Sequence, residues 1–297
     1  MYDVLVGLSL VVVASIGSVV WNLFAKRSRN KRVFLSLTIS GSIVTMAVAN
    51  LIGITTGLIE PSLPAGFFPV VIADAVLLVF SFSSLALAYQ HGEMSVVYPV
   101  WRLFPLFVYV FGLLVLGESV TTLALLGIVV SVVGGYTIGL PDLRSFLQPL
   151  RSIRNPAFFY AVLAALGTTG SYLLQRSIVP QMSPFVYNVF LQGFAAPLML
   201  TTTLLLVKNA KQELRTEWHE NRLPIVMVAL IGPITLVFTL YSLHFLAASL
   251  SATFSQIAIV LGALTGIVFL GERDRLGIKI ASSLLIFAGI ALIVFAR

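Results

Sequence analysis

Residues 96–118 read VVYPVWRLFPLFVYVFGLLVLGE, and this stretch decides the fold. It is apolar over roughly the 20 residues that a helix needs to cross the hydrocarbon core of a bilayer. Inside it lie one arginine, Arg102, and two prolines, Pro99 and Pro105. A charge within a membrane span is costly and typically marks a transport pathway. The stretch therefore predicts a membrane helix that carries a transport site.

The composition of the whole chain points to the same class of protein. Of its 297 residues, 59% are hydrophobic and 10% are charged, whereas a soluble domain carries about 25% charged residues. We therefore expect a polytopic membrane protein. The chain has no cysteine and only three scattered histidines, so no disulfide, thiolate chemistry or metal centre is expected, and no cofactor.

Ten apolar segments of roughly 20 residues follow one another along the chain. They predict an all-α integral membrane fold with ten transmembrane helices. The predicted spans cover residues 3–25, 33–57, 66–90, 95–116, 120–140, 156–177, 183–207, 223–246, 249–270 and 276–296.

The positive charges are distributed unevenly between the connecting loops. Most of the 18 Lys and Arg residues lie in the first, fifth, seventh and ninth loops, and the even-numbered loops hold only Arg176. Basic loops tend to face the cytoplasm, so this count places both termini outside. Because the net charge of +7 is explained by orientation, no nucleic-acid partner is expected.

The second half of the chain repeats features of the first half in the same order. Leu116-Gly117-Glu118 recurs as Leu270-Gly271-Glu272, and Gly135 matches Gly289. The repeats predict two units, residues 1–140 and 156–297, joined by a linker at 141–155. Since each unit holds five spans, the two would lie inverted in the membrane around a central cavity, with the substrate near the midplane.

Several short motifs also connect the chain with a known family. Ala88-Tyr89-Gln90-His91-Gly92, followed by Tyr98-Pro99, resembles the junction between the third and fourth spans in the EamA-type branch of the drug/metabolite transporter superfamily. Trp21-Asn22, followed by Lys26, resembles the end of the first span in one subgroup. The resemblance implies a ten-helix permease that exports metabolites. It also implies cytoplasmic termini, opposite to the charge count, so the orientation stays open.

Helical spacing places Tyr98, Arg102 and Tyr109 on one face of the fourth span, with Trp101 beside them. The repeat puts Gln256 at the position of Arg102 in the opposite half. Arginine forks onto carboxylate or phosphate groups, so we expect Arg102 to coordinate an anionic substrate. The alternative is an arginine that snorkels to the interface or pairs with Glu93.

Asp74 is the other ionisable group well inside a span. It fits proton or ion coupling, or recognition of a substrate amine; the alternative is a structural pair with Arg102 or a hydrogen-bonded carboxyl. Glu118 and Glu272 are expected to cap the helices that follow them. The remaining candidates for substrate binding are polar or aromatic residues of the first, sixth and seventh spans, which in the alternative only join helices: Trp21, Asn22, Tyr172, Asn188 and Gln192.

These features together predict a secondary transporter, not an enzyme, since no nucleophile–base pair, metal cluster or nucleotide-binding loop is present in the sequence. The substrate is a small polar or amphiphilic metabolite, such as an amino acid or another carboxylate- or phosphate-bearing compound. The protein is expected in the inner or plasma membrane, in contact with the lipid bilayer. The small residues of the fifth and tenth spans serve as scaffold or as a homodimer surface. Rival interpretations are a lipid or amphiphile flippase and a non-transporting sensor.

Overall fold

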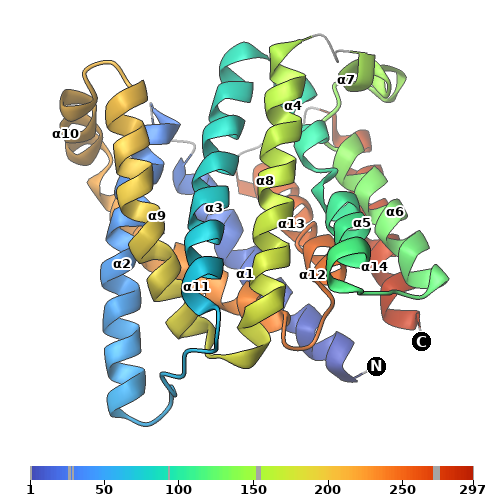
Figure 1. The fold of residues 1–297 in the computed structure, drawn as a ribbon. Coiled ribbons are helices and arrows are strands. Elements are labelled where there is room, and N and C mark those ends of the chain that lie inside the picture. Colours follow the sequence, from blue (N-terminus) through green and yellow to red (C-terminus); the bar gives the residue numbers. More distant parts are fainter. Residues whose placement is uncertain are drawn as a thin grey trace.

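The computed structural model describes residues 2–25, 28, 30–92, 94–151, 155–269 and 275–296, and all regular structure in these ranges is helical (Figure 1). The helices of the first half are α1 (Tyr2–Ala25), α2 (Lys31–Thr55), α3 (Phe67–His91), α4 (Met94–Trp101), α5 (Phe104–Leu116) and α6 (Thr122–Thr137). Those of the second half are α8 (Pro156–Ile178), α9 (Pro184–Leu206), α11 (Arg222–Ser242), α12 (Ala248–Phe254), α13 (Ile257–Phe269) and α14 (Leu276–Phe295). Short elements connect them: η1 (Leu143–Ser145), α7 (Gln148–Arg151), η2 (Val179–Gln181) and α10 (Ala210–Glu220).

The prediction of an all-α integral membrane fold is confirmed. Within the described ranges, 9 segments are long and apolar enough to cross a membrane, and α6 is a shorter apolar helix of 16 residues. Each coincides with one predicted span. Two connections hold helices that the sequence did not predict, α7 in the linker and α10 in the hydrophilic stretch 208–222.

The fourth span is interrupted at Arg102 and Leu103, between α4 and α5. A proline at position 105 has no N–H to donate to the carbonyl of Trp101, and its ring would clash with that carbonyl in a continuous helix. The chain therefore turns and restarts with Pro105 in the first turn of α5, where proline is tolerated. The ninth span breaks at Ser255 and Gln256 although no proline is nearby, and the backbone there forms shorter-range bonds such as Gln256 N–H to the Thr253 carbonyl, 3.0 Å.

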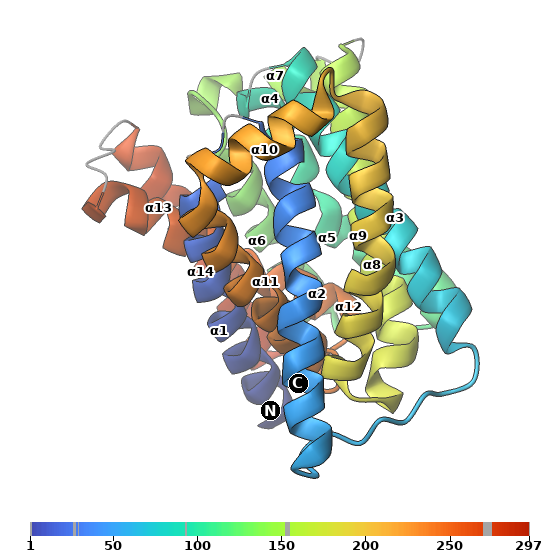
Figure 2. The same ribbon diagram turned by 90° about the vertical axis from the view of Figure 1, so that its left-hand side faces the viewer.

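Helices from the two halves pack against each other in pairs. α3 lies against α8, α1 against α11, α2 against α9, and α6 against α14. Both chain ends lie at one end of the bundle, whereas α7 and α10 lie at the opposite end (Figures 1 and 2). Such reciprocal packing is compatible with two inverted copies, and the division into units 1–140 and 156–297 stays a prediction.

The glycines of α6 and α14 form a close helix–helix contact. A Cβ atom on Gly289 would lie 2.5 Å from the carbonyl oxygen of Gly127 and 2.5 Å from the amide nitrogen of Ser131. Small residues allow two membrane helices to approach at backbone distance. These glycines therefore make a helix–helix contact within one chain, which supports the scaffold interpretation. A homodimer remains a prediction.

Replacing Gly289 with alanine is expected to destabilise the protein, because the backbone of α6 must move to admit the methyl group. Overpacking of this kind costs about 1–3 kcal/mol. A Cβ atom on Gly277, in the same helix, would meet no neighbouring atom within 4 Å, so Gly277→Ala is the control. Thermal unfolding of the two variants in detergent measures the difference. Equal melting temperatures would contradict the packing at α6 and α14.

Candidate functional site

Arg102 lies at the break between α4 and α5 and is surrounded by aromatic rings. Its guanidinium carbon is 4.9 Å from the ring centre of Tyr98 and 4.5 Å from that of Trp101. Aromatic faces attract a cation through their quadrupole, but they bring no negative charge. The structure thus brings together three residues that helical spacing places on one face or beside it. Tyr109 lies two turns further along, in α5.

A second set of rings joins this cluster to α8. Trp101 stacks on Phe104 at 6.2 Å between centroids, and Phe104 lies 5.7 Å from Tyr172 of α8. The Tyr172 hydroxyl also lies close to Ser255, at the break between α12 and α13. Tyr172 therefore belongs to the same cluster as Arg102, and the two helix breaks meet at its side chain.

Gln256 reaches the backbone of Arg102 from the opposite half. Its Nε2 atom donates to the Arg102 carbonyl oxygen at 3.4 Å. That carbonyl is available because Leu106 N–H bonds to Leu103 instead of continuing the helical pattern. The expected correspondence of Arg102 and Gln256 thus becomes a direct contact, made with the backbone and not with the guanidinium.

No acidic side chain pairs with Arg102 within the part of the chain that the structure describes. Its Nε atom and the Oε1 atom of Gln256 are buried without a hydrogen-bond partner. Pairing with Asp74 is not observed, because the carboxylate binds other groups. Glu93, the other suggested partner, lies outside the described residues, as do the side chains of the candidates Trp21 and Asn22.

Asp74 lies fully buried in α3, at the interface with α8 and α9. One carboxylate oxygen accepts a very short hydrogen bond from the Ser171 hydroxyl. The other accepts from Gln175 Nε2 at 3.0 Å and from the Tyr187 hydroxyl at 2.7 Å. Sequence reasoning misses Ser171 and Tyr187, because polarity alone does not separate them from ordinary helix contacts.

Asn188 and Gln192 lie in the interface between α9 and α11 instead of beside Arg102. Asn188 Nδ2 donates to the Pro233 carbonyl at 2.8 Å, and Gln192 Nε2 donates to the Asn188 side-chain oxygen at 3.3 Å. These contacts fit the interhelical alternative. They join helices where Pro233 disturbs the backbone pattern of α11.

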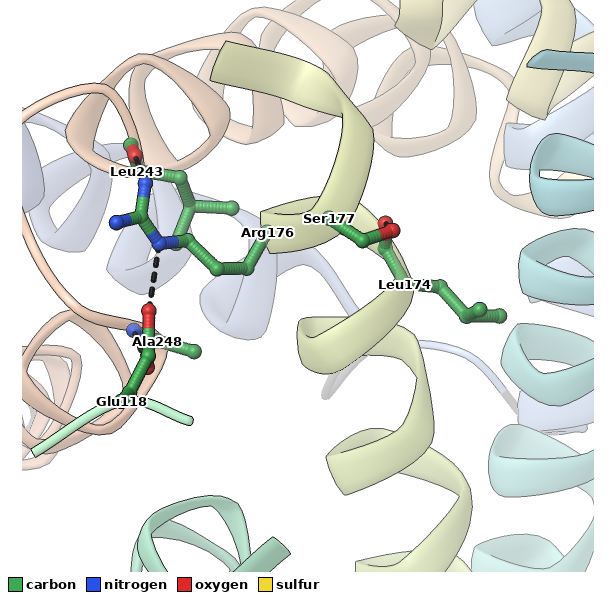
Figure 3. A network of polar contacts seen from close by, with 6 residues as sticks. All are labelled: Glu118, Leu174, Arg176, Ser177, Leu243 and Ala248. Atoms are coloured by element: carbon green, nitrogen blue, oxygen red, sulfur yellow. Dashed lines mark hydrogen bonds and ion pairs between the residues drawn. The ribbon is translucent and has the colours of Figure 1, made fainter. Parts of the chain in front are cut away.

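A charged cluster lies at the end of the bundle where the termini are found. We call it the Glu118–Arg176 cluster; it comprises Glu118, Arg176, the carbonyl of Leu243 and the amide of Ala248 (Figure 3). Arg176 Nε lies 2.6 Å from Glu118 Oε1, and its Nη1 donates to the Leu243 carbonyl at 2.6 Å. Glu118 Oε2 accepts from the Ala248 amide at 2.9 Å. The cluster joins the α5–α6 loop to α8, α11 and α12 of the other half.

The prediction that Glu118 caps the helix following it is wrong. Thr121 caps α6 by accepting from Ala124 N–H at 3.3 Å, whereas Glu118 caps α12. The reason is the backbone of Gly117, whose φ of 66° ends α5 in a left-handed turn. Only glycine adopts this conformation without strain, and it directs the chain toward the second half. Glu272, its partner in the repeat, lies outside the described residues.

Comparison with known proteins places this geometry in a family. Residues 155–295 match the model of the EamA-like transporter family. This segment belongs to that family. A solved crystal structure also superposes with a TM-score of 0.72 at 18% sequence identity, covering 100% of this chain and 99% of that chain. At this identity the second likeness shows the fold alone. No curated protein matches the chain.

The family match confirms the resemblance that the motifs at residues 88–92 and 98–99 indicated. The apolar helices make the chain a multi-pass membrane protein, and its residues 155–295 belong to a transporter family. A transporter family also fits a protein without catalytic activity. The EamA match covers the half that holds Tyr172, Arg176 and Gln256, so three members of the two clusters lie on the matched segment.

The Glu118–Arg176 cluster is expected to hold the adjoining helix ends together, so that reagents in solution do not reach the residues between them. Because the chain has no native cysteine, a single Ser251→Cys substitution reports access to this region; Ser251 is fully buried and bonds to Ser242 at 2.7 Å. Adding Glu118→Gln removes the charge pair and should speed labelling of the introduced thiol by a maleimide several-fold. Glu60→Gln, at an exposed acidic residue in the α2–α3 loop, is the control. Identical rates would exclude a closing role for the cluster.

Proposed function

We propose that this protein is a secondary transporter that moves a small anionic metabolite by alternating access, with Arg102 binding the anionic group. The single observation that carries this proposal is an arginine at a helix break without an acidic partner among the described residues. A charge in a membrane span is retained when it serves a substrate or ion pathway. Burial of its Nε without a hydrogen bond adds a cost that a bound anion would relieve.

The substrate class follows from the groups around Arg102. A guanidinium binds carboxylate or phosphate through two parallel hydrogen bonds. Tyr98, Trp101 and Tyr172 add ring faces and hydroxyl groups beside it. This combination favours a small compound with one acidic group and an apolar or planar portion. Amino acids and other organic acids fall within this class.

Two features of the bundle support alternating access. At the end that holds the Glu118–Arg176 cluster, α5 packs against α12. Over the described residues, no comparable packing joins α4 to α13, the corresponding pair under the predicted repeat, and α13 leans away from the other helices near α10 (Figure 2). We infer that the protein is closed at the first end and open at the second. Exchange of these roles between two inverted halves would carry the substrate across.

We also propose that the end carrying α10 faces the cytoplasm of a cell whose inner or plasma membrane holds the protein. That end carries most of the basic loops, and basic loops are retained on the cytoplasmic side. In the α10 region, Gln212 is exposed. Gln212→Cys in intact cells should resist a membrane-impermeant maleimide and react after lysis, whereas Ser62→Cys in the α2–α3 loop should react in intact cells. The reverse pattern would overturn the orientation.

Transport through the Arg102 site can be measured in proteoliposomes. Substrates are first selected by thermal shift from a library of organic acids, amino acids and phosphorylated metabolites. Arg102→Ala should lower kcat/KM by about 10- to 100-fold, as expected for loss of hydrogen bonds to a charged group. The kcat/KM of Arg102→Lys should lie between those of the wild type and Arg102→Ala, because lysine keeps the charge but cannot form two parallel hydrogen bonds.

Arg215→Ala, at an exposed arginine of α10, is the matched control and should transport normally. Undiminished uptake by Arg102→Ala would exclude the site. Transfer of labelled lipid between leaflets, unaffected by organic acids, would instead favour a flippase.

A further inference from the structure

Asp74 differs from every other buried polar group in the described part of α3 because it is ionisable. Its two oxygens are held by Ser171 and Gln175 of α8 and by Tyr187 of α9. These three donors are uncharged. Apolar residues one turn or less away, Val71 and Ala75, are fully buried. The carboxyl group therefore lies in a dry setting between three helices.

No cationic side chain faces Asp74 from the helices that pack against α3, over their described residues. Neither α9 nor α4 contains a charged residue, and the titratable group in contact is the neutral Tyr187. Arg176, the only cation of α8, binds Glu118 instead. Arg32 of α2 donates to the Ser83 carbonyl at 3.4 Å. Ser83 lies nine residues from Asp74, which is about 13 Å along α3. The charged groups on these helices and α3 are Lys31, Arg32, His91 and Arg176.

The hydrogen-bond network accepts either protonation state of Asp74. The Ser171 hydroxyl donates to an ionised carboxylate and can accept from a protonated one, since a hydroxyl group serves both roles. Gln175 Nε2 lies 3.0 Å from the Ser171 oxygen as well as 3.0 Å from Asp74. A proton can thus be bound and released without loss of partners. Ionisation still costs free energy here because the negative charge has no counter-charge.

A short chain of contacts leads from Asp74 to the aromatic residues around Arg102. Ser171 is one helical turn from Thr168 on α8. The Thr168 hydroxyl lies 2.9 Å from that of Ser81, two turns along α3 from Asp74, and accepts from Trp101 Nε1 at 3.3 Å. Trp101 in turn lies against the Arg102 guanidinium. Any shift of α3 against α8 therefore moves the aromatic wall of the Arg102 site.

We propose that Asp74 is the proton-binding site that couples proton movement to substrate transport: with substrate bound, the bundle changes conformation readily only when Asp74 is neutral, and without substrate it returns with Asp74 ionised. The inference rests on the proposed transport function. Ionised Asp74 requires water or a cation, and so favours separation of α3 from α8. Protonated Asp74 needs neither, and so favours the packed arrangement. One proton is bound on one side of the membrane and released on the other, and no covalent bond changes.

The test compares two modes of transport: exchange of substrate across the membrane, and accumulation of substrate driven by a pH gradient. Asp74→Asn is permanently neutral, and its amide keeps hydrogen-bonding groups in place. In proteoliposomes it should retain substrate counterflow, which needs no driving force, but lose accumulation driven by a pH gradient. Asp74→Glu, which restores a titratable group, should recover part of that accumulation. Pronounced pH-driven accumulation by Asp74→Asn would overturn the proposal, as would loss of counterflow in a variant with an unchanged melting temperature.

A second measurement does not depend on the substrate. Infrared difference spectra of the purified protein during a pH titration should show loss of a buried carboxylic acid band and gain of a carboxylate band, both missing in Asp74→Asn. If no such band depends on Asp74, the coupling proposal fails whatever is transported. If the band is present but Arg102→Ala and wild type transport alike, the proton site stands and the proposed substrate site fails.

Discussion

The contact between the Gln256 amide and the Arg102 carbonyl is the point on which the interior arrangement depends. Backbone groups within a bilayer must find partners inside the protein, so an interrupted helix is tolerated only where another element supplies them. Pro105 interrupts one span, Leu106 N–H bonds to Leu103 instead of Arg102, and the Arg102 carbonyl is met by a side chain from the corresponding break in the other half. The two breaks must therefore face each other. Their meeting leaves Arg102 at the two breaks, in one aromatic cluster with Tyr172 of α8.

Two carboxylates show how the same chemical group serves different ends in one bundle. Glu118 is partly accessible, carries a full counter-charge on Arg176, and caps a helix of the opposite half. Its charge is permanently compensated, which suits a group that holds helix ends together. Asp74 is fully buried among neutral donors. Its charge has no such compensation, which suits a group whose protonation changes. Position and partners, not residue type, separate the two roles.

Much of the fold could be predicted from the sequence, because hydropathy over about 20 residues reports a membrane span directly. The grouping of Tyr98, Trp101 and Arg102 also followed from helical periodicity. The break at Ser255 and Gln256 could not be foreseen, since no proline marks it and only the correspondence of Gln256 with Arg102 points to it. The helix that Glu118 caps was predicted incorrectly for another reason. A motif at the end of a helix gives no information on distant chain segments, and the Ala248 amide is far along the sequence. Likewise, Tyr187 became visible as a partner of Asp74 only once α9 was placed beside α3.

The exposure of the Glu118–Arg176 pair has a consequence for how the protein responds to its surroundings. The side chains are 28% and 13% accessible for Arg176 and Glu118, respectively. Dissolved ions screen exposed charges that lie more than about 8 Å apart at physiological ionic strength, and they screen partly buried pairs much less. The Glu118–Arg176 pair, at 2.6 Å and mostly buried, therefore keeps most of its strength when the salt concentration of one compartment changes.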